Sequence, residues 1–225
     1  MLSMRRIFIA LTCLCGANFL QAQGYFLDKG VSGFGIDAGF SSNDTVTGFG
    51  CSTGYSFKGL VDVGLFAGLY SLDGTLNGYS VSATDIIPSV TAHVFKQNER
   101  IPFSLAINAA YGFITYSSDA LDNAHSEWTA NHFAFGFTIY RYFLVTQTVK
   151  LQPSIGVGYS IGQSNLSDNL GNSIKTDINT ANFSLALSVY FNTSPSTIFL
   201  FTPALNFDKD NTTFSLSIGF VFPTS

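Results

Sequence analysis

The stretch FSLSIGFVF, residues 214 to 222, alternates strictly between large apolar and small side chains. Phe214, Ile218 and Phe222 fall on one face, and serine, glycine and valine fall on the other. Successive side chains of a strand point to opposite sides, so the segment is predicted to be a β-strand with one bulky and one small face. The fold depends on whether the bulky face meets a protein core or lipid.

The composition argues against an ordinary soluble domain. Only 11% of the 225 residues are charged, whereas soluble domains have about 25%. Aromatic residues reach 15%, with 23 phenylalanines. The length fits one all-β domain. Such a chain has too few charges to cover a surface that faces water.

Residues 1–22 have the features of a secretory signal peptide. Arg5 and Arg6 precede a short apolar run, and a small-residue cleavage site ends at Ala22. The residues just before the two cysteines of this region are not the small ones that a lipoprotein signal requires. We expect a cleaved signal peptide and one barrel domain over residues 23–225. Cleavage removes two arginines and no acids, so the net charge goes from −4 to −4 − 2 = −6, which argues against nucleic acid as a partner.

About ten alternating segments follow, each near the 9 to 11 residues that a tilted strand needs to cross a bilayer. No stretch beyond the signal approaches the roughly 18 apolar residues of a spanning helix. The fourth segment changes phase around Ile86, Ile87 and Pro88, which predicts a β-bulge or two shorter strands and keeps eight strands as an alternative count. The expected segments are 31–41, 47–57, 60–71, 79–95, 101–115, 130–142, 148–162, 180–192, 196–207 and 212–222.

Short and longer polar connections alternate along the chain, as an up-and-down barrel with two different ends requires. The basic residues Lys58, Lys96, Arg100 and Arg141 lie in or beside the short connections. Acidic residues gather in the longer ones, which are predicted to be outer loops. The acidic loop residues are Asp119, Asp122, Glu127, Asp168, Asp177, Asp208 and Asp210.

Aromatic residues flank the short connections and predict a girdle at one membrane interface, where amphipathic rings prefer the headgroup zone. We expect this girdle on the periplasmic side. Its members are Phe57, Phe95, Phe103, Tyr142, Phe191, Phe199 and Phe222.

The polar faces of the strands decide which solvent the bulky faces meet. In a soluble sandwich these Gly, Ser, Ala and Asn faces would form the exterior, where many Lys and Glu are expected and few are present. In a membrane they would line an enclosed lumen, and closure is obligatory because unpaired backbone groups in hydrocarbon cost several kcal/mol each. The sequence therefore predicts a transmembrane up-and-down antiparallel β-barrel of about ten strands.

The signal peptide, the amphipathic strands between residues 24 and 222 and the Phe-rich closing strand resemble the small outer-membrane β-barrel proteins of Gram-negative bacteria, a class that includes OmpA-like, OmpX-like and opacity-type barrels. The resemblance implies a multi-pass protein of the cell envelope whose partners are outer-membrane lipid, lipopolysaccharide and the barrel-assembly machinery. That machinery would read the closing strand, which here continues beyond Phe222 as Pro-Thr-Ser.

Candidate sites lie in the loops and in the lumen. The segment 117–132 combines acidic residues with His125 and His132 near a tryptophan, a set that could do acid/base work in a barrel enzyme. Nothing in its spacing fixes such geometry, so we expect a solvated loop, no catalytic residue, no metal and no cofactor. In the lumen we expect a polar network of Asp37, Asp62, His93 and Lys150, and inward aromatic rings from Phe66, Tyr70, Tyr140 and Tyr190.

These features predict a non-enzymatic barrel with a structural or surface-interaction role, whose extracellular ligand the sequence does not identify. A narrow channel or transporter for small or hydrophobic solutes is the alternative, because a lumen lined by small residues can leave a passage. A lipid-modifying enzyme or protease of the outer membrane is the third hypothesis.

Overall fold

A computed structural model describes residues 25–76, 79–194 and 196–224 of the chain. The predicted signal peptide lies outside these ranges. Ten long antiparallel strands, one two-residue strand and one short helix follow each other along the sequence. They are β1 (Ser32–Ser42), β2 (Val46–Phe57), β3 (Val61–Leu76), β4 (Tyr79–Phe95), β5 (Ser104–Ser117), α2 (Asp119–Asn123), β6 (Ser126–Tyr140), β7 (Phe143–Leu144), β8 (Val149–Asp168), β9 (Ser173–Ser194), β10 (Thr197–Phe207) and β11 (Thr212–Thr224).

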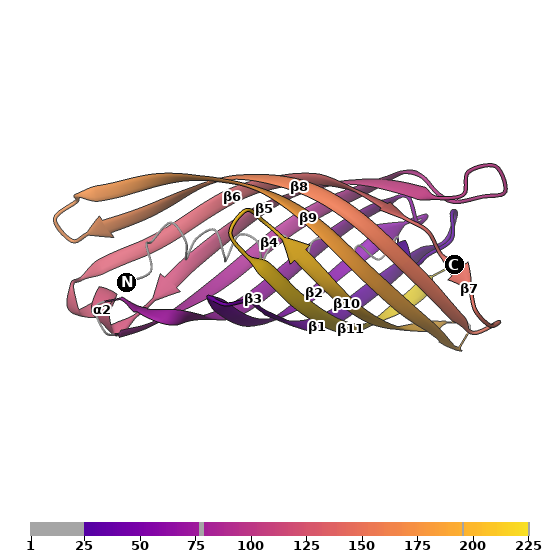
Figure 1. The fold of residues 1–225 in the computed structure, drawn as a ribbon, viewed down its shortest axis with the longest axis horizontal. Coiled ribbons are helices and arrows are strands. Elements are labelled where there is room, and N and C mark those ends of the chain that lie inside the picture. Colours follow the sequence, from indigo (N-terminus) through magenta and orange to yellow (C-terminus); the bar gives the residue numbers. More distant parts are fainter. Residues whose placement is uncertain (1–24, 77–78, 195, 225) are drawn as a thin grey trace.

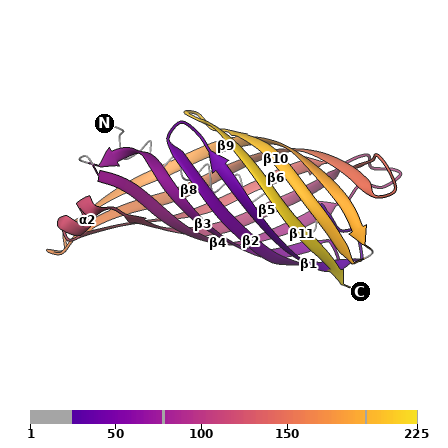
Figure 2. The same cartoon turned by 90° about the horizontal axis from the view of Figure 1, so that it is seen from below.

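The sheet closes on itself into a barrel. Each long strand pairs with the next one along the chain, β6 pairs directly with β8, and β1 pairs with β11, where Ile36 lies opposite Phe220. Figures 1 and 2 show the strands running obliquely around the wall. Closure leaves no open edge among the long strands, so their backbone groups pair within the wall. The prediction of an up-and-down barrel with ten strands is confirmed.

The bulky face of the last strand points outward. Phe214, Ile218 and Phe222 are between 39% and 50% exposed, whereas Ser217 and Val221 are buried inside the barrel. The same alternation runs through the other strands and covers the exterior with Phe, Leu, Ile and Val side chains. The question raised by the closing strand is therefore answered: its phenylalanines form part of the outer wall.

The two ends of the barrel differ. We call one of them the α2 end, where α2 and the β8–β9 turn lie, and the other the short-turn end, where β7 and the C-terminus lie (Figure 1). The basic residues Lys58, Lys96 and Arg141 follow β2, β4 and β6 at the short-turn end. Within the described ranges no helix has the length and apolarity to cross a membrane.

The predicted irregularity in β4 is wrong. Ile87 points inward and is fully buried, Ile86 and Pro88 point outward, and the pairing with β5 keeps one register from Ile86 to Ser89. The apparent change of phase arises because this strand carries apolar residues on both faces, with Ile87 belonging to an internal core. The register shifts instead near Phe95, against β5, and beyond Leu72, against β3.

Two predicted loops are largely strand. β8 and β9 extend through most of the segment 163–179, and Gln163 donates to Asp177 across them at 3.0 Å. β5 and β6 likewise extend into the segment 117–132, so Glu127 lies on an exposed strand position. Polar residues occupy both faces of these extensions, which removes the hydrophobic alternation that would have revealed them.

Candidate functional site

The interior is the candidate site, and the α2 end of it is filled by an apolar cluster. The rings of Trp128 and Tyr116 stack with centroids 3.9 Å apart. The indole Nε1 of Trp128 donates to Ser164 Oγ at 2.6 Å, which satisfies the only polar group of this side chain. Leu121 of α2 packs into the same cluster, so the short helix covers this end of the lumen.

Two further rings, of Phe66 and Tyr70 on β3, fill the wall side of this cluster. They pack closely against glycines of β2: a Cβ added at Gly48 would fall 2.1 Å from Tyr70 Cδ1, and one added at Gly50 would fall 2.3 Å from Phe66 Cζ. Glycine is therefore required at both positions by the close approach of an aromatic ring. The inward aromatic residues predicted from the sequence do fill the lumen.

The short-turn end is filled by the segment that precedes the first strand. Tyr25, Phe26 and Leu27 are buried and belong to a second apolar cluster. Tyr25 meets the ring of Tyr140 edge-on at 4.7 Å between centroids, and Phe26 meets that of Tyr190 at 5.0 Å. We call residues 25–31 the plug, because they occupy the mouth formed by the wall.

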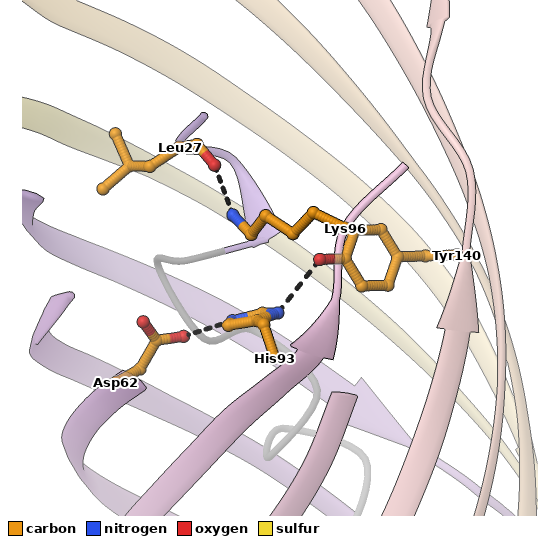
Figure 3. Close-up of polar contacts among 5 residues, drawn as sticks. All are labelled: Leu27, Asp62, His93, Lys96 and Tyr140. Atoms are coloured by element: carbon orange, nitrogen blue, oxygen red, sulfur yellow. Dashed lines mark hydrogen bonds and ion pairs between the residues drawn. The ribbon is translucent and has the colours of Figure 1, made fainter. Parts of the chain in front are cut away.

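A buried polar chain lies beneath the plug. His93 Nε2 is 2.9 Å from Asp62 Oδ2, and His93 Nδ1 is 2.9 Å from the hydroxyl of Tyr140 (Figure 3). Tyr25 packs edge-on over the imidazole of His93 at 5.0 Å. All four side chains are buried. The arrangement fixes the histidine ring between a carboxylate and a hydroxyl, and the plug covers it.

Lys96 ties the plug to the wall. Its Nζ donates to the backbone carbonyl of Leu27 (Figure 3). Burial lowers the pKa of Lys96 to about 8, because the charged ammonium loses water, and the nearby carboxylates of Asp62 and Asp28 offset part of this effect. Lys96 thus extends into the mouth and contacts the plug. The sequence predicted only that it lies in a short basic connection.

A polar band separates the two apolar clusters. On β9 the inward positions between Ile178 of one cluster and Tyr190 of the other are small or polar, and Ser188 accepts a hydrogen bond from Thr202 at 2.9 Å. Asp37 also belongs here and accepts a hydrogen bond from Ser52. The lumen is therefore layered as apolar, polar and apolar along the barrel.

The structure joins only part of the predicted lumen network. Asp62 and His93 are in direct contact, whereas Asp37 is paired with Ser52. Lys150 lies over the ring of Tyr142, with Nζ 5.4 Å from the centroid. Lys150 and Tyr142 both line a pocket of about 60 Å³ next to the plug. Tyr142 thus stands at the mouth itself.

Other girdle residues make contacts with each other along the short-turn end. Phe95 and Phe103 have ring centroids 5.6 Å apart, and Phe191 and Phe199 are 5.9 Å apart. Phe57 is exposed beside Tyr55 at 4.8 Å. Exposed rings such as those of Phe49 and Phe135 also lie elsewhere on the outer wall, so a girdle at the interface between lipid and water stays a prediction.

The residues weighed for acid/base work do not share one site. His132 is buried inside the barrel with its ring over Gly112, whereas His125 is an exposed residue with a positive φ of 48°. Among the described residues, no group of three His, Cys, Asp or Glu side chains could hold a metal ion. Asp208 accepts hydrogen bonds from the backbone N–H groups of Asp210 and Asn211 and so shapes a hairpin tip.

The plug is the feature that sequence reasoning missed. Tyr25, Phe26 and Leu27 stand just before β1 and outside its alternating pattern, so no periodicity marks them. Their signal is a run of three large apolar residues in a segment with no predicted strand. Such a run needs a place to be buried.

The chain matches no known family model and no curated protein sequence. It is similar in structure to the translocator domain of the autotransporter NalP from Neisseria meningitidis, with a TM-score of 0.63 and 11% identity over 97% of this chain and 99% of that one. It also resembles the β domain of the Bordetella autotransporter BrkA, with a TM-score of 0.50 and 11% identity over 87% and 99%. The outer-membrane protease OmpT from Escherichia coli gives a TM-score of 0.47 and 9% identity over 87% and 94%.

These likenesses concern the fold alone, because the identities are low. The chain has the fold of the outer-membrane β-barrels. It is a ten-stranded barrel with an apolar exterior, a layered interior and a plug formed by its own N-terminal segment.

Proposed function

We propose that the chain is an integral protein of a bacterial outer membrane with a structural or surface-interaction role and no catalytic activity. The observation that carries this proposal is the packing of both ends of the lumen. The stack of Trp128 and Tyr116 with Leu121 fills one end, and Tyr25 and Phe26 fill the other. When both ends of the lumen are filled, the outer wall contacts lipid, and the two rims of the barrel are the surfaces left for partners.

The α2 end is the surface that such a role would use. Asp119 and Asp122 on α2, Asp168 at the β8–β9 turn and Asp208 and Asp210 at the last turn give it an acidic rim. We propose that this rim faces outward and the basic short-turn end faces the periplasm. Outer-membrane lipid, lipopolysaccharide and the barrel-assembly machinery are the proposed partners, together with an extracellular ligand whose chemistry the rim alone does not specify.

The test is the conductance of the purified full-length protein in a planar lipid bilayer, with a wide porin as the positive control. We expect insertion without discrete current steps. Regular steps that increase in number with added protein would contradict a closed barrel. A protein that stays monomeric in water without detergent would contradict the membrane location itself.

A narrow channel for small solutes is the second candidate, favoured by the polar band of the lumen. Ser184, Ser188 and Thr202 belong to this band and have side chains too small to fill a ten-stranded barrel by themselves. The conductance experiment separates the two functions. An enzyme is the third candidate, and the variants His125→Ala and His132→Ala would lose activity if either histidine took part.

A further inference from the structure

We propose that the plug, residues 25–31, is displaceable, and that its release opens the polar band of the lumen to the short-turn side while the α2 end stays closed. This end of the barrel would then be a gated vestibule, a property beyond the structural role proposed above.

The barrel wall is complete without the plug. Residues 25–31 belong to no strand, and the first strand begins only at Ser32. β1 pairs with β11 from Ser32 to Ser42 and with β2 from Gly33 to Ser42. Removing the plug would therefore expose apolar side chains of the mouth without breaking any ladder of the sheet.

Few polar contacts hold the plug in place. Lys96 donates to the carbonyl of Leu27, and the backbone N–H of Gly30 donates to the carbonyl of Lys58 at 2.9 Å. The carboxylate of Asp28 also lies near the ammonium of Lys96. The rings of the plug otherwise make edge-on contacts with His93, Tyr140 and Tyr190. Contacts of this kind are individually small and can be exchanged for others.

Gly30 provides a hinge between the plug and the wall. Its φ is +97°, a backbone conformation that only glycine adopts without strain, and no atom lies within 4 Å of the position a Cβ would take. The chain can thus change direction at this residue without a steric obstacle. Val31 and Ser32 then lead into β1, which stays paired.

There is room for the plug to move. A groove of about 490 Å³ lies between the plug and the ends of neighbouring strands. Phe26, Leu27 and Val31 line one side of it, and Lys150 and Ile198 belong to the other. Open space therefore lies beside the plug, and a sideways shift of the plug would enter this groove.

The half-buried ammonium of Lys96 favours release. Its pKa is lowered because the occupied mouth withholds water from it, so the ammonium would regain solvation when the plug leaves. The α2 end differs, since the cluster around Trp128 and Tyr116 consists of residues of the wall strands and of α2, which is held between β5 and β6. Release would give access from one side and not a through passage.

Thiol labelling tests the proposal. Ser184 is a buried residue of β9 that faces the polar band, and Ser184→Cys would be made in a Cys51→Ser background so that it supplies the reactive thiol. The reagent is neutral N-ethylmaleimide, applied to the mature protein folded in detergent, from which cleavage of residues 1–22 has removed Cys13 and Cys15. With the plug intact we expect slow labelling. The triple variant Tyr25→Ser, Phe26→Ser and Leu27→Ser should label at least tenfold faster.

A second variant keeps the test decisive if the triple variant does not fold. Gly30→Ala strains the plugged conformation at its hinge and removes no apolar contact, so it should also speed labelling of Ser184→Cys. Ser173→Cys, at the exposed start of β9, is the matched control and should label at one rate in every background. Equal rates at Ser184→Cys with and without the plug changes would overturn the proposal, and so would fast labelling with the plug intact.

Discussion

Nε2 of His93 lies 2.9 Å from Oδ2 of Asp62 in a part of the barrel closed to water. A histidine and a carboxylate are costly to bury unless their polar atoms are paired, and the hydroxyl of Tyr140 provides a partner for the other ring nitrogen. The pair fixes the imidazole on which the ring of Tyr25 rests. Its role is thus to shape the mouth in which the plug sits.

Breaking this pair should destabilise the barrel. Asp62→Ala leaves His93 buried without its carboxylate, and loss of one partner of a buried pair costs about 3–5 kcal/mol. Urea unfolding in lipid vesicles, followed by the fluorescence of the single tryptophan, measures the change. The matched control is Asp177→Ala on the exposed face of β9, which should change the free energy of unfolding by less than about 0.5 kcal/mol. Equal effects of the two variants would contradict a structural pair.

The hydrogen bond of the tryptophan gives a second prediction. Ser164→Ala removes the acceptor of Trp128 Nε1 and leaves a buried N–H group without it, which costs about 1–3 kcal/mol. The same unfolding measurement applies, because the fluorophore is retained. Ser173→Ala, at an exposed position, is the control. A Ser164→Ala protein as stable as the wild type would mean that the indole finds another acceptor.

Two glycines that face the lumen should respond differently to a methyl group. Gly48→Ala places a Cβ 2.1 Å from the packed ring of Tyr70, and overpacking of this kind costs about 1–3 kcal/mol. Gly64→Ala places a Cβ 3.1 Å from the rotatable hydroxyl of Ser89 and 3.6 Å from the carbonyl oxygen of Thr53, and it should change stability by less than about 0.5 kcal/mol. The difference in urea midpoint between the two variants is the readout. An equal decrease in urea midpoint for both variants would show that the packed aromatic ring is not the reason for glycine at position 48.

The outer wall is tested by a charge placed on it. Leu185 lies in the middle of the outward apolar run of β9, and an arginine near the bilayer centre costs about 2–4 kcal/mol in a barrel. Leu185→Arg should lower the free energy of unfolding in vesicles by this amount. Asp177→Arg, farther along the same face toward the α2 end, should be nearly neutral. A neutral Leu185→Arg would place this face in water and contradict the membrane assignment.

Much of the fold could be predicted because one periodicity repeats along the wall. Where bulky and small residues alternate, as from Phe214 to Phe222, a local pattern determines both the strand and its outward face. The pattern fails where both faces carry the same kind of residue. Ile86 and Ile87 are both apolar, and the tips of β8 and β9 are polar on both sides, so neither could be assigned from alternation.

The interior could be predicted only in part, because contacts across a barrel depend on register and not on local sequence. Asp62 and His93 were expected to face inward, and the pairing of β3 with β4 brings them together. Lys96 and the plug follow no strand period. Their contact spans 69 positions of the chain, which no local pattern can reveal.

The stability of the barrel should rise with pH through Lys96. Burial lowers the pKa of its ammonium to about 8, although the carboxylates of Asp62 and Asp28 offset part of this effect. The pKa of a lysine in the unfolded chain is about 10.4. Between these values the unfolded chain binds more protons than the folded one, so the free energy of unfolding increases with pH. The burial penalty is fully present below about pH 8 and fades above it.

Lys96→Met isolates this effect, because the variant keeps the other titrating groups and lacks the ammonium. The difference in free energy of unfolding between wild type and variant should be constant below about pH 7.5 and should shift in favour of the wild type up to pH 9.5. Burial also raises the pKa of Tyr25 above its ordinary value of 10.0. This shift lowers the free energy of unfolding only above about pH 10, and it does so equally in the wild type and the variant. A difference that stays constant across this range would mean that Lys96 is solvated in the folded barrel, and the plug would then not cover it.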